Sequence, residues 1–364
     1  MRRKPTIQDI ARRAAVSDTA VSLAFRENSR VSAATRARIL SIAQELDYVP
    51  NRTARALRSG ETRSIGFIVT DITDPFYSRM IRSAETIVLE YGFGIIFAES
   101  NWDADREIRA VNDMIESRVQ GLLLCFCEKT RKSQEIIERS HLPVIAVDTY
   151  PRYYTGPYVA NDVRQAGRMA AEHLARAGSR FPIFFNADET MCDFSAFSLL
   201  LKGFTECLRE RGIPFGPSSV INADITILGG MQGFAHLLDT HRPFDGIFCV
   251  NDLCAIGVME AAEQNGYRVG RDLAVMGIDN LETAGLSRIS LTSIDQPYDQ
   301  IIEAATRSMM RSLESKRPCV IRKRFAPRLV MRASTEGTAP PRRHGPSGPG
   351  TVPRAKARPG SAPR

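Results

Sequence analysis

Five acidic or amide side chains follow apolar segments of the chain, at points where a strand would end. They are Asp71, Asp148, Asn251, Asp252 and Asp279. In an open parallel sheet the carboxyl ends of the strands share one edge, and ligands bind beyond that edge. Carboxylate and amide groups placed there could hydrogen-bond with a small polar molecule. The alternative is that each residue caps a helix or closes a turn, because Asp and Asn favour both positions.

The segments that would position these residues alternate between short apolar runs and amphipathic stretches. From Ser64 the chain reads IGFIVTD, an amphipathic stretch over 75–91, GIIFAES, a second stretch after Asp103, GLLLCF, a third stretch and PVIAVD. After Asn161 the pattern starts again, with FPIFF, a strand near Val220, GIFCV and LAVMGID separated by helices. Nearly continuous Ile, Val, Leu and Phe in these runs is typical of buried parallel strands, so the sequence predicts an α/β fold.

The first fifty residues carry helix signals instead. Thr6 followed by Asp9 is typical of an N-cap with an acidic first turn, and the apolar residues between 7 and 14 then share one helical face. Ser17 can cap a second helix, DTAVSLAF, after a very short turn, and a third helix follows Ser32. Two short helices joined by so brief a turn predict a helix-turn-helix, whose second helix fits the major groove of DNA.

Basic residues are concentrated at the two ends of the chain. Residues 1–60 carry a net charge of +7 and residues 337–364 carry +6, whereas the segment between them carries −5. A basic N-terminal region on a mildly acidic body points to contact with a polyanion, although a merely solvated basic surface is the alternative. The C-terminal segment is also rich in Pro, Gly and Ser, so we predict that it is disordered.

The linker between these regions reads YVPNRTARALRSG. Pro50 ends the third helix, and Asn51 can cap a further one. Arg55, Leu57 and Arg58 lie on this segment, which is too short to be a stable helix by itself. We expect it to become helical only against a partner.

Several function classes lack their sequence signatures. No G-x-S-x-G, Walker A, H-E-x-x-H or G-x-G-x-x-G pattern occurs, so nothing indicates an enzyme. The seven cysteines form no C-x-x-C pair, and a metal site at Cys125 and Cys127 is disfavoured because alternate residues of a strand face opposite ways. The N-terminus has no signal-peptide pattern and no apolar run is long enough to span a membrane. We therefore expect a cytoplasmic protein without cofactor or metal.

Eight strings stand in a characteristic order along the chain. They are PTIQDIARRAAVSDTAVS, VSAATRARI, LDYVPNRTARALRSG, TRSIGFIVTDITDPFY, HRPFDGIFCVNDLCAIGVMEA, DLAVMGIDN, LTSIDQP and PRLVMRAST. In this order they closely resemble the lactose-repressor and galactose-repressor (LacI/GalR) family of bacterial regulators, over nearly all of the chain except its C-terminal tail. The resemblance implies a helix-turn-helix head over 1–49, a hinge helix and linker over 50–63, and a two-lobed effector-binding and dimerisation domain over 64–336. That domain would resemble periplasmic sugar-binding proteins, and the tail would occupy 337–364.

The resemblance assigns polar residues of the head and hinge to DNA. Asp18, Thr19 and Ser22 would read base edges. Asp18 would accept a hydrogen bond from a cytosine amino group, or else it complements the helix dipole. The backbone-contacting positions would be Thr6, Ser17, Arg26, Arg30, Ser32, Thr35 and Asn51, with an exposed loop charge as the alternative for Arg26 and Arg30. Leu57, flanked by Arg55 and Arg58, would wedge into the minor groove, unless it packs on the large domain or on a second copy.

The resemblance also implies a small-molecule effector, expected to be a sugar or a sugar derivative, between the two lobes. Its contacts would be Phe76, Asp148, Phe194, Ile225, Asp279 and Gln296. The chain departs from the family where Leu200 replaces an effector-clamping Arg, Ile225 a stacking aromatic residue, Leu23 an Arg of the second helix, and Ala15 a Gly in the turn. Without a guanidinium fork the site should hold carboxylate or phosphate poorly.

Together these features predict a homodimeric, sequence-specific DNA-binding regulator, a repressor of carbohydrate-uptake or catabolic genes. Twofold symmetry of the protein predicts an inverted-repeat operator on double-stranded DNA. Two other interpretations remain open, namely a solute-binding receptor without a DNA function and a regulator whose effector is not a sugar.

Overall fold

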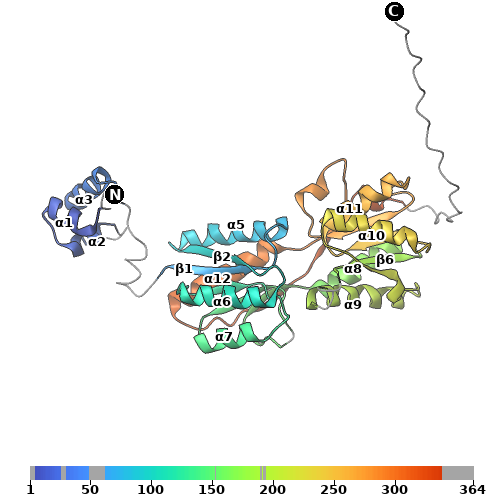
Figure 1. Ribbon diagram of the computed structural model, residues 1–364, viewed down its shortest axis with the longest axis horizontal. Coiled ribbons are helices and arrows are strands. Elements are labelled where there is room, and N and C mark those ends of the chain that lie inside the picture. The colour runs from blue at the N-terminus through green and yellow to red at the C-terminus, as the bar shows by residue number, and fades with distance from the viewer. Residues whose placement is uncertain are drawn as a thin grey trace, which may run out of the picture. The chain divides into compact units, whose positions relative to one another are not determined.

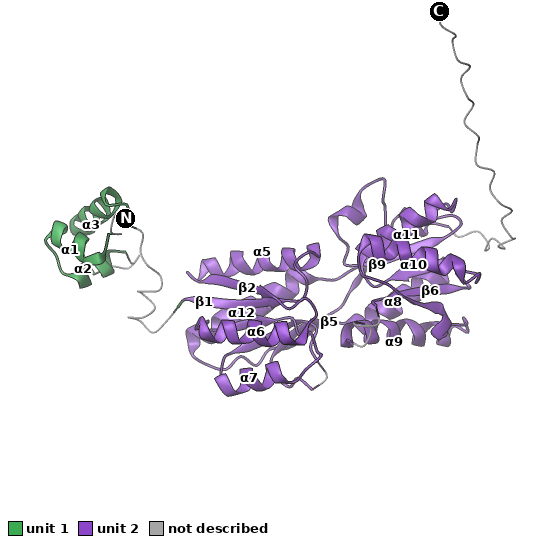
Figure 2. Ribbon diagram, viewed as in Figure 1, with its two compact units in different colours: residues 1–62 green, residues 63–364 purple. Residues whose placement is uncertain are grey.

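The computed structural model describes residues 5–25, 30–48, 62–151, 153–188, 191 and 194–337. The chain divides into two compact units, residues 1–62 and residues 63–364 (Figure 2). The predicted hinge helix and all but the first residue of the predicted tail therefore lie outside the described residues.

In its described residues the first unit forms three helices, α1 (Ile7–Ala14), α2 (Asp18–Ala24) and α3 (Ala33–Glu45). Their buried apolar side chains meet in one small core, which includes Ile10, Val21 and Ile39. Between α1 and α2, Ala15 has a φ of 51°, in the left-handed region that usually favours glycine. The predicted helix-turn-helix is confirmed, and the strained position of the turn is occupied by an alanine at a cost of ~1 kcal/mol.

The second unit has two lobes, each built on one sheet (Figure 1). In the first lobe the order of described strands is β11-β5-β4-β3-β1-β2, and every pairing is parallel. Their bounds are β1 Ser64–Val69, β2 Gly94–Glu99, β3 Leu122–Leu124, β4 Val144–Asp148, β5 Tyr158–Asn161 and β11 Arg322–Phe325. Helices α5 (Pro75–Glu90) and α12 (Tyr298–Ser315) bury one face, and α6 (Ala104–Glu116) and α7 (Lys132–Ser140) bury the other.

The second lobe repeats this design. Its described strands are ordered β12-β10-β9-β8-β6-β7, and only the edge strand β12 is antiparallel to its neighbour among them. Their bounds are β6 Pro182–Asn186, β7 Val220–Asn222, β8 Gly246–Cys249, β9 Ala274–Ile278, β10 Thr292–Asp295 and β12 Arg328–Val330. Helices α8 (Val163–Arg176) and α9 (Ser195–Glu210) cover one face, and α10 (Ile227–Asp239) and α11 (Asp252–Gln264) cover the other. Short 3-10 helices occupy Pro217–Ser219, Glu282–Gly285 and Ala333–Thr335.

The lobes are joined by more connections than the sequence pattern indicates. Within the described residues the chain passes between the lobes three times: after β5, between β10 and α12, and between β11 and β12. The alternating pattern predicts one lobe after the other, yet α12 and β11 return to the first lobe. Helix α12 buries Ile301, Ile302 and Met309 in the core of the first lobe. Burial of this apolar face explains why the helix packs on the first sheet.

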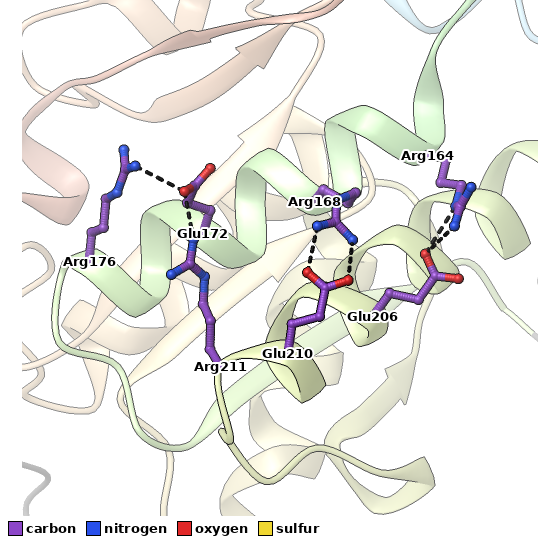
Figure 3. A network of polar contacts seen from close by, with 7 residues as sticks. All are labelled: Arg164, Arg168, Glu172, Arg176, Glu206, Glu210 and Arg211. Carbon is purple, nitrogen blue, oxygen red and sulfur yellow. Dashed lines mark hydrogen bonds and ion pairs between the residues drawn. The ribbon is translucent and has the colours of Figure 1, made fainter.

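Helices α8 and α9 approach unusually closely. A Cβ at Gly167 would lie 2.0 Å from the carbonyl oxygen of Leu200, and a Cβ at Gly203 would lie 2.0 Å from that of Arg164. Ion pairs flank this contact: Arg164 with Glu206 at 2.6 Å, Arg168 with both carboxylate oxygens of Glu210 at 2.9 and 2.6 Å, and Glu172 with Arg176 and Arg211 (Figure 3). Such exposed pairs each stabilise little, so the glycines rather than the charges fix the helix spacing.

We expect Gly203→Ala to lower the free energy of unfolding of the second unit by about 2 kcal/mol, because the added methyl must push the two backbones apart. Chemical denaturation followed by circular dichroism measures this. Gly216→Ala is the matched control, since Gly216 has an extended φ of −155° and open space around it. A Gly203 variant as stable as the Gly216 variant would contradict the close packing.

Candidate functional site

The polar residues predicted to read base edges gather at the start of α2. Ser17 is the N-cap of this helix, and its hydroxyl accepts a hydrogen bond from the backbone N–H of Ala20 at 3.1 Å. Asp18 and Thr19 occupy the exposed first turn, and Ser22 lies one turn further along. An exposed Asp18 in the first turn is compatible with base reading and with a favourable dipole interaction, so both interpretations of it remain.

The hydroxyls predicted to contact the DNA backbone also begin helices. Thr6 and Asp9 form a capping box on α1, in which the backbone N–H of Thr6 donates to the Asp9 carboxylate at 2.9 Å. Ser32 caps α3 and donates to the Thr35 hydroxyl at 2.9 Å, and Arg30 is exposed nearby in sequence. Helix N-termini are suited to binding phosphate. The remaining predicted DNA contacts, Arg26, Asn51, Arg55, Leu57 and Arg58, lie outside the described residues.

A cleft lies between the two lobes of the second unit. Five of the six predicted effector contacts line it: Phe76, Asp148, Ile225, Asp279 and Gln296. Phe194 is not among the residues that line the cleft. Its ring is buried and lies 4.9 Å from that of Trp102, which does line it, so Phe194 supports the wall from behind.

Asp148 is an acid of the cleft whose position is fixed by its backbone conformation and by a hydrogen bond. It ends β4 in the left-handed region, with a φ of 71°, and its carboxylate accepts a hydrogen bond from the side-chain amide of Asn161 at 2.7 Å. Burial raises the pKa of Asp148 to about 7, and the neighbouring charges of Asp74 and Glu128 add to the effect. A non-glycine residue held at positive φ beside a cleft is typical of functional sites.

Asp279 repeats this arrangement in the second lobe. It follows β9 with a φ of 111°, and it accepts a hydrogen bond from the side-chain amide of Gln296 at 2.6 Å. Burial, together with the charges of Asp74 and Asp252, raises the pKa of Asp279 well above its ordinary value. Two backbone-strained acids, one from each lobe, therefore face the same cleft.

The other strand-end candidates have structural roles: Asp71 and Asn251 close a turn and cap a helix, as their alternative interpretation predicts, whereas Asp252 does neither. Asp71 accepts from the backbone N–H and the hydroxyl of Thr73, at 2.7 and 2.6 Å, which closes a turn. Asn251 caps α11 and donates to the carbonyl of Ile225 at 2.7 Å. Both nevertheless line the cleft. Asp252 lies beside it, fully buried and bonded to Ser293 and Leu281.

Sequence reasoning missed several residues of the cleft, among them Asp74 and Trp102. Asp74 caps α5 and accepts from the backbone N–H of Phe76 at 2.9 Å, and burial raises its pKa. The pair Asp74-Pro75 at a helix start was the signal that could have identified it. Trp102 lies in the turn after β2, where no sequence pattern marks it. Leu200, noted as a departure from the family, does line the cleft.

The residues that the structure describes include no group of three or more His, Cys, Asp or Glu side chains arranged to hold a metal ion. Cys125, Cys249 and Cys254 are buried free thiols. No helix of the described chain is long and apolar enough to cross a membrane.

Comparison with known families agrees with this architecture. Residues 6–51 match the family described as bacterial regulatory proteins, lacI family, and residues 62–328 match the periplasmic binding proteins and sugar binding domain of the LacI family. The chain belongs to the LacI family. The predicted family and the predicted fold class are therefore confirmed, and a LacI-family protein is a transcription regulator.

Relatives of this LacI-family chain are similar over nearly their whole length. Catabolite control protein A of Priestia megaterium is 30% identical over 85% of this chain and 93% of its own. The ribose operon repressor of Escherichia coli K12 is 29% identical over 82% of this chain and 90% of its own. The structure of the Lac repressor bound to ONPG in its repressed state shares the fold, with a TM-score of 0.80 at 21% identity over 91% of this chain and all of that chain.

Proposed function

We propose that this chain is a homodimeric, sequence-specific repressor of carbohydrate-uptake or catabolic genes, controlled by an effector bound between its lobes. The observation that carries the proposal is the order of parts in one chain, a helix-turn-helix unit followed by a two-lobed unit with polar groups facing a cleft. The names of its relatives, among them ribose operon repressors, support the choice of target genes. The protein would act on the chromosome in the cytoplasm, without cofactor or metal and without catalysing a reaction.

In this proposal the head at 1–49 places α2 in the major groove. Asp18, Thr19 and Ser22 would contact base edges, because they share the N-terminal part of α2 that such helices present to DNA. The positions that would contact phosphates are Thr6, Ser17, Arg26, Arg30, Ser32, Thr35 and Asn51. A hinge helix within 50–63 would form on the DNA. The tail at 337–364 would remain disordered.

The hydrogen bonds of the cleft suggest how effector binding would be coupled to DNA binding. Asp148 is bonded to Asn161, the last residue before the first connection between the lobes, and Asp279 is bonded to Gln296, which lies on the second connection. An effector that competes for these carboxylates would act on both connections at once. A change in the angle between the lobes would then decide whether paired hinge helices can form.

Genome-wide mapping of the sites that the protein occupies tests this proposal. We expect inverted-repeat sequences next to genes for carbohydrate uptake or breakdown. Purified protein that prefers no duplex over a scrambled competitor, at low salt and with any candidate metabolite, would overturn the proposal.

The hinge itself can be tested with Leu57→Ala. We expect specific binding to an isolated operator to weaken about tenfold or more, because the residue would no longer be inserted between base pairs, while non-specific binding is spared. Titration of operator and scrambled duplexes in a gel-shift assay measures both. An equal loss on the two duplexes would argue against the wedge.

A further inference from the structure

The inter-lobe cleft is acidic. Its described lining contains the carboxyl groups of Asp71, Asp74, Asp148 and Asp279, and among these described residues there is no Lys, Arg or His. Asp74, Asp148 and Asp279 are each at most 7% exposed. Three buried carboxyl groups facing one cavity strongly favour a positively charged occupant over a negative one.

The outer part of the cleft is also net negative. A second hollow shares Asp71, Trp102 and Ile225 with the first, so the two adjoin. Its described lining contains four carboxyl groups against two cations, Arg106 and Lys129, and the acids are Asp71, Asp103, Asp188 and Asp224. An anionic group would therefore meet net repulsion at both depths.

The charged forms of the acids in the cleft repel one another when no cation lies between them. The charge of Asp74 raises the pKa of Asp148 and of Asp279, in addition to the effect of burial. A cation placed among them would favour their charged forms and remove this cost.

Polar groups without a partner indicate that the occupant also forms hydrogen bonds. Gln296 is only 9% exposed and lines the cleft, yet its side-chain carbonyl oxygen has no hydrogen-bond partner. The indole N–H of Trp102 is likewise buried without an acceptor. An ammonium or hydroxyl group could donate to Gln296, and a hydroxyl could accept from Trp102.

The walls of the cleft complete the description of the occupant. Aromatic rings of Phe76, Tyr77, Trp102 and Phe197 line it, and such rings attract cations over their faces as well as packing on apolar edges. Leu200, at 3% exposed, contributes an apolar surface from α9.

We propose that the cleft selects a polyhydroxylated amine, such as an amino sugar, and rejects phosphorylated and carboxylated metabolites. This inference rests on the proposed function in one respect, namely that the cleft is the effector site. The protonated amine would lie among Asp74, Asp148 and Asp279, and hydroxyl groups would bond to Gln296 and Trp102.

The test uses the full chain without DNA and measures binding by calorimetry. The probes are matched sets built on a hexose, a pentose and an acyclic polyol, each offered as the neutral, amino, carboxylate and phosphate compound. We expect an amino compound to bind at least about tenfold more tightly than its neutral counterpart, with no binding of the anions. Tighter binding of a neutral or anionic member would overturn the proposal, and so would an absence of binding by every amino compound at about 10 mM.

The pH dependence separates an amine from a neutral sugar. Asp148 faces Asp74, Glu128, Tyr77 and Asn161, and Asp279 faces Asp74, Asp252, Asp148 and Gln296. Burial raises the pKa of Asp148 to about 7, so this acid is partly protonated near neutral pH in the free protein, and binding a cation beside it releases a proton. Affinity for the amine should therefore rise between about pH 5 and pH 7, where the amine itself stays protonated. An affinity independent of pH over this range would contradict binding of a cation at these acids.

Leu200→Arg provides a variant with the opposite preference, and Leu200→Met is its size-matched control. The guanidinium should abolish binding of the amino compound and allow a phosphate or carboxylate compound to bind, whereas the Met variant should keep the original preference. Thermal unfolding checks that both variants fold. Failure of all these ligand experiments would leave operator binding intact, whereas failure of the proposed function would appear as absent operator binding, so the two can be told apart.

Discussion

Replacing Ile39 with alanine is expected to abolish DNA binding by this chain while its second unit stays folded. Ile39 is fully buried at the centre of the three-helix core, which has eight buried apolar residues within the described part of the first unit. Removing its side chain beyond Cβ costs about 3 kcal/mol. A domain this small has only a few kcal/mol of stability, so most of the variant's heads should be unfolded.

The measurement is a gel-shift titration on an operator isolated from mapped sites, together with calorimetric effector binding. We expect at least about a hundredfold loss of operator affinity and unchanged effector affinity. Leu40→Ala is the matched control, because Leu40 is the next residue of the same helix but is 37% exposed. If the Ile39 and Leu40 variants bind DNA equally well, the core of the head has been assigned wrongly.

Replacing Asp252 with alanine is expected to destabilise the second unit by about 3 kcal/mol. The Asp252 carboxylate accepts a hydrogen bond from the Ser293 hydroxyl at 2.6 Å and one from the backbone N–H of Leu281 at 2.8 Å. Alanine would leave both donors buried without a partner, at about 1–3 kcal/mol for each. Denaturant unfolding followed by circular dichroism measures the loss.

The same residue makes stability depend on pH. Burial raises the pKa of Asp252 to about 7, so folding favours the protonated acid. Its contribution to stability is full below about pH 4, the ordinary pKa of an Asp, and is lost as the pH rises through about 7. Asp252→Asn keeps an acceptor for Leu281 and should flatten this decline in the free energy of unfolding. A variant whose stability changes with pH as steeply as that of the unsubstituted protein would contradict the raised pKa.

The paired bonds of the cleft suggest why its acids are strained. Asp148 and Asp279 each adopt a positive φ. Asp148 accepts from Asn161, the residue just before the first connection between the lobes, and Asp279 accepts from Gln296 on the second connection. Holding a non-glycine residue in this region costs of order 1 kcal/mol or more, and the surrounding bonds must offset that cost. The acids are thus held in place by the segments whose movement would alter the angle between the lobes.

Local signals in the sequence determined the elements and their order. Thr6, Ser17 and Ser32 begin helices as predicted, because a side-chain oxygen can satisfy backbone N–H groups within the next turn. The apolar runs at 64–69 and 144–148 form buried parallel strands because each can be covered on both faces. Strand-end logic also found Asp148 and Asp279, since a parallel sheet brings carboxyl ends to one edge.

Tertiary structure alone decided how these parts act together. Several features join residues that no local pattern links. They are the hydrogen bonds of Asp148 to Asn161 and of Asp279 to Gln296, the return of α12 to the first lobe, and the position of Phe194 behind Trp102. The raised pKa values likewise depend on burial and on charges from distant segments. Hydrogen-bond and helix signals act over a few residues, whereas burial and electrostatic coupling arise only after the chain has folded. For that reason the sequence predicted five of the cleft's effector contacts but not Asp74, Trp102 or the raised pKa values.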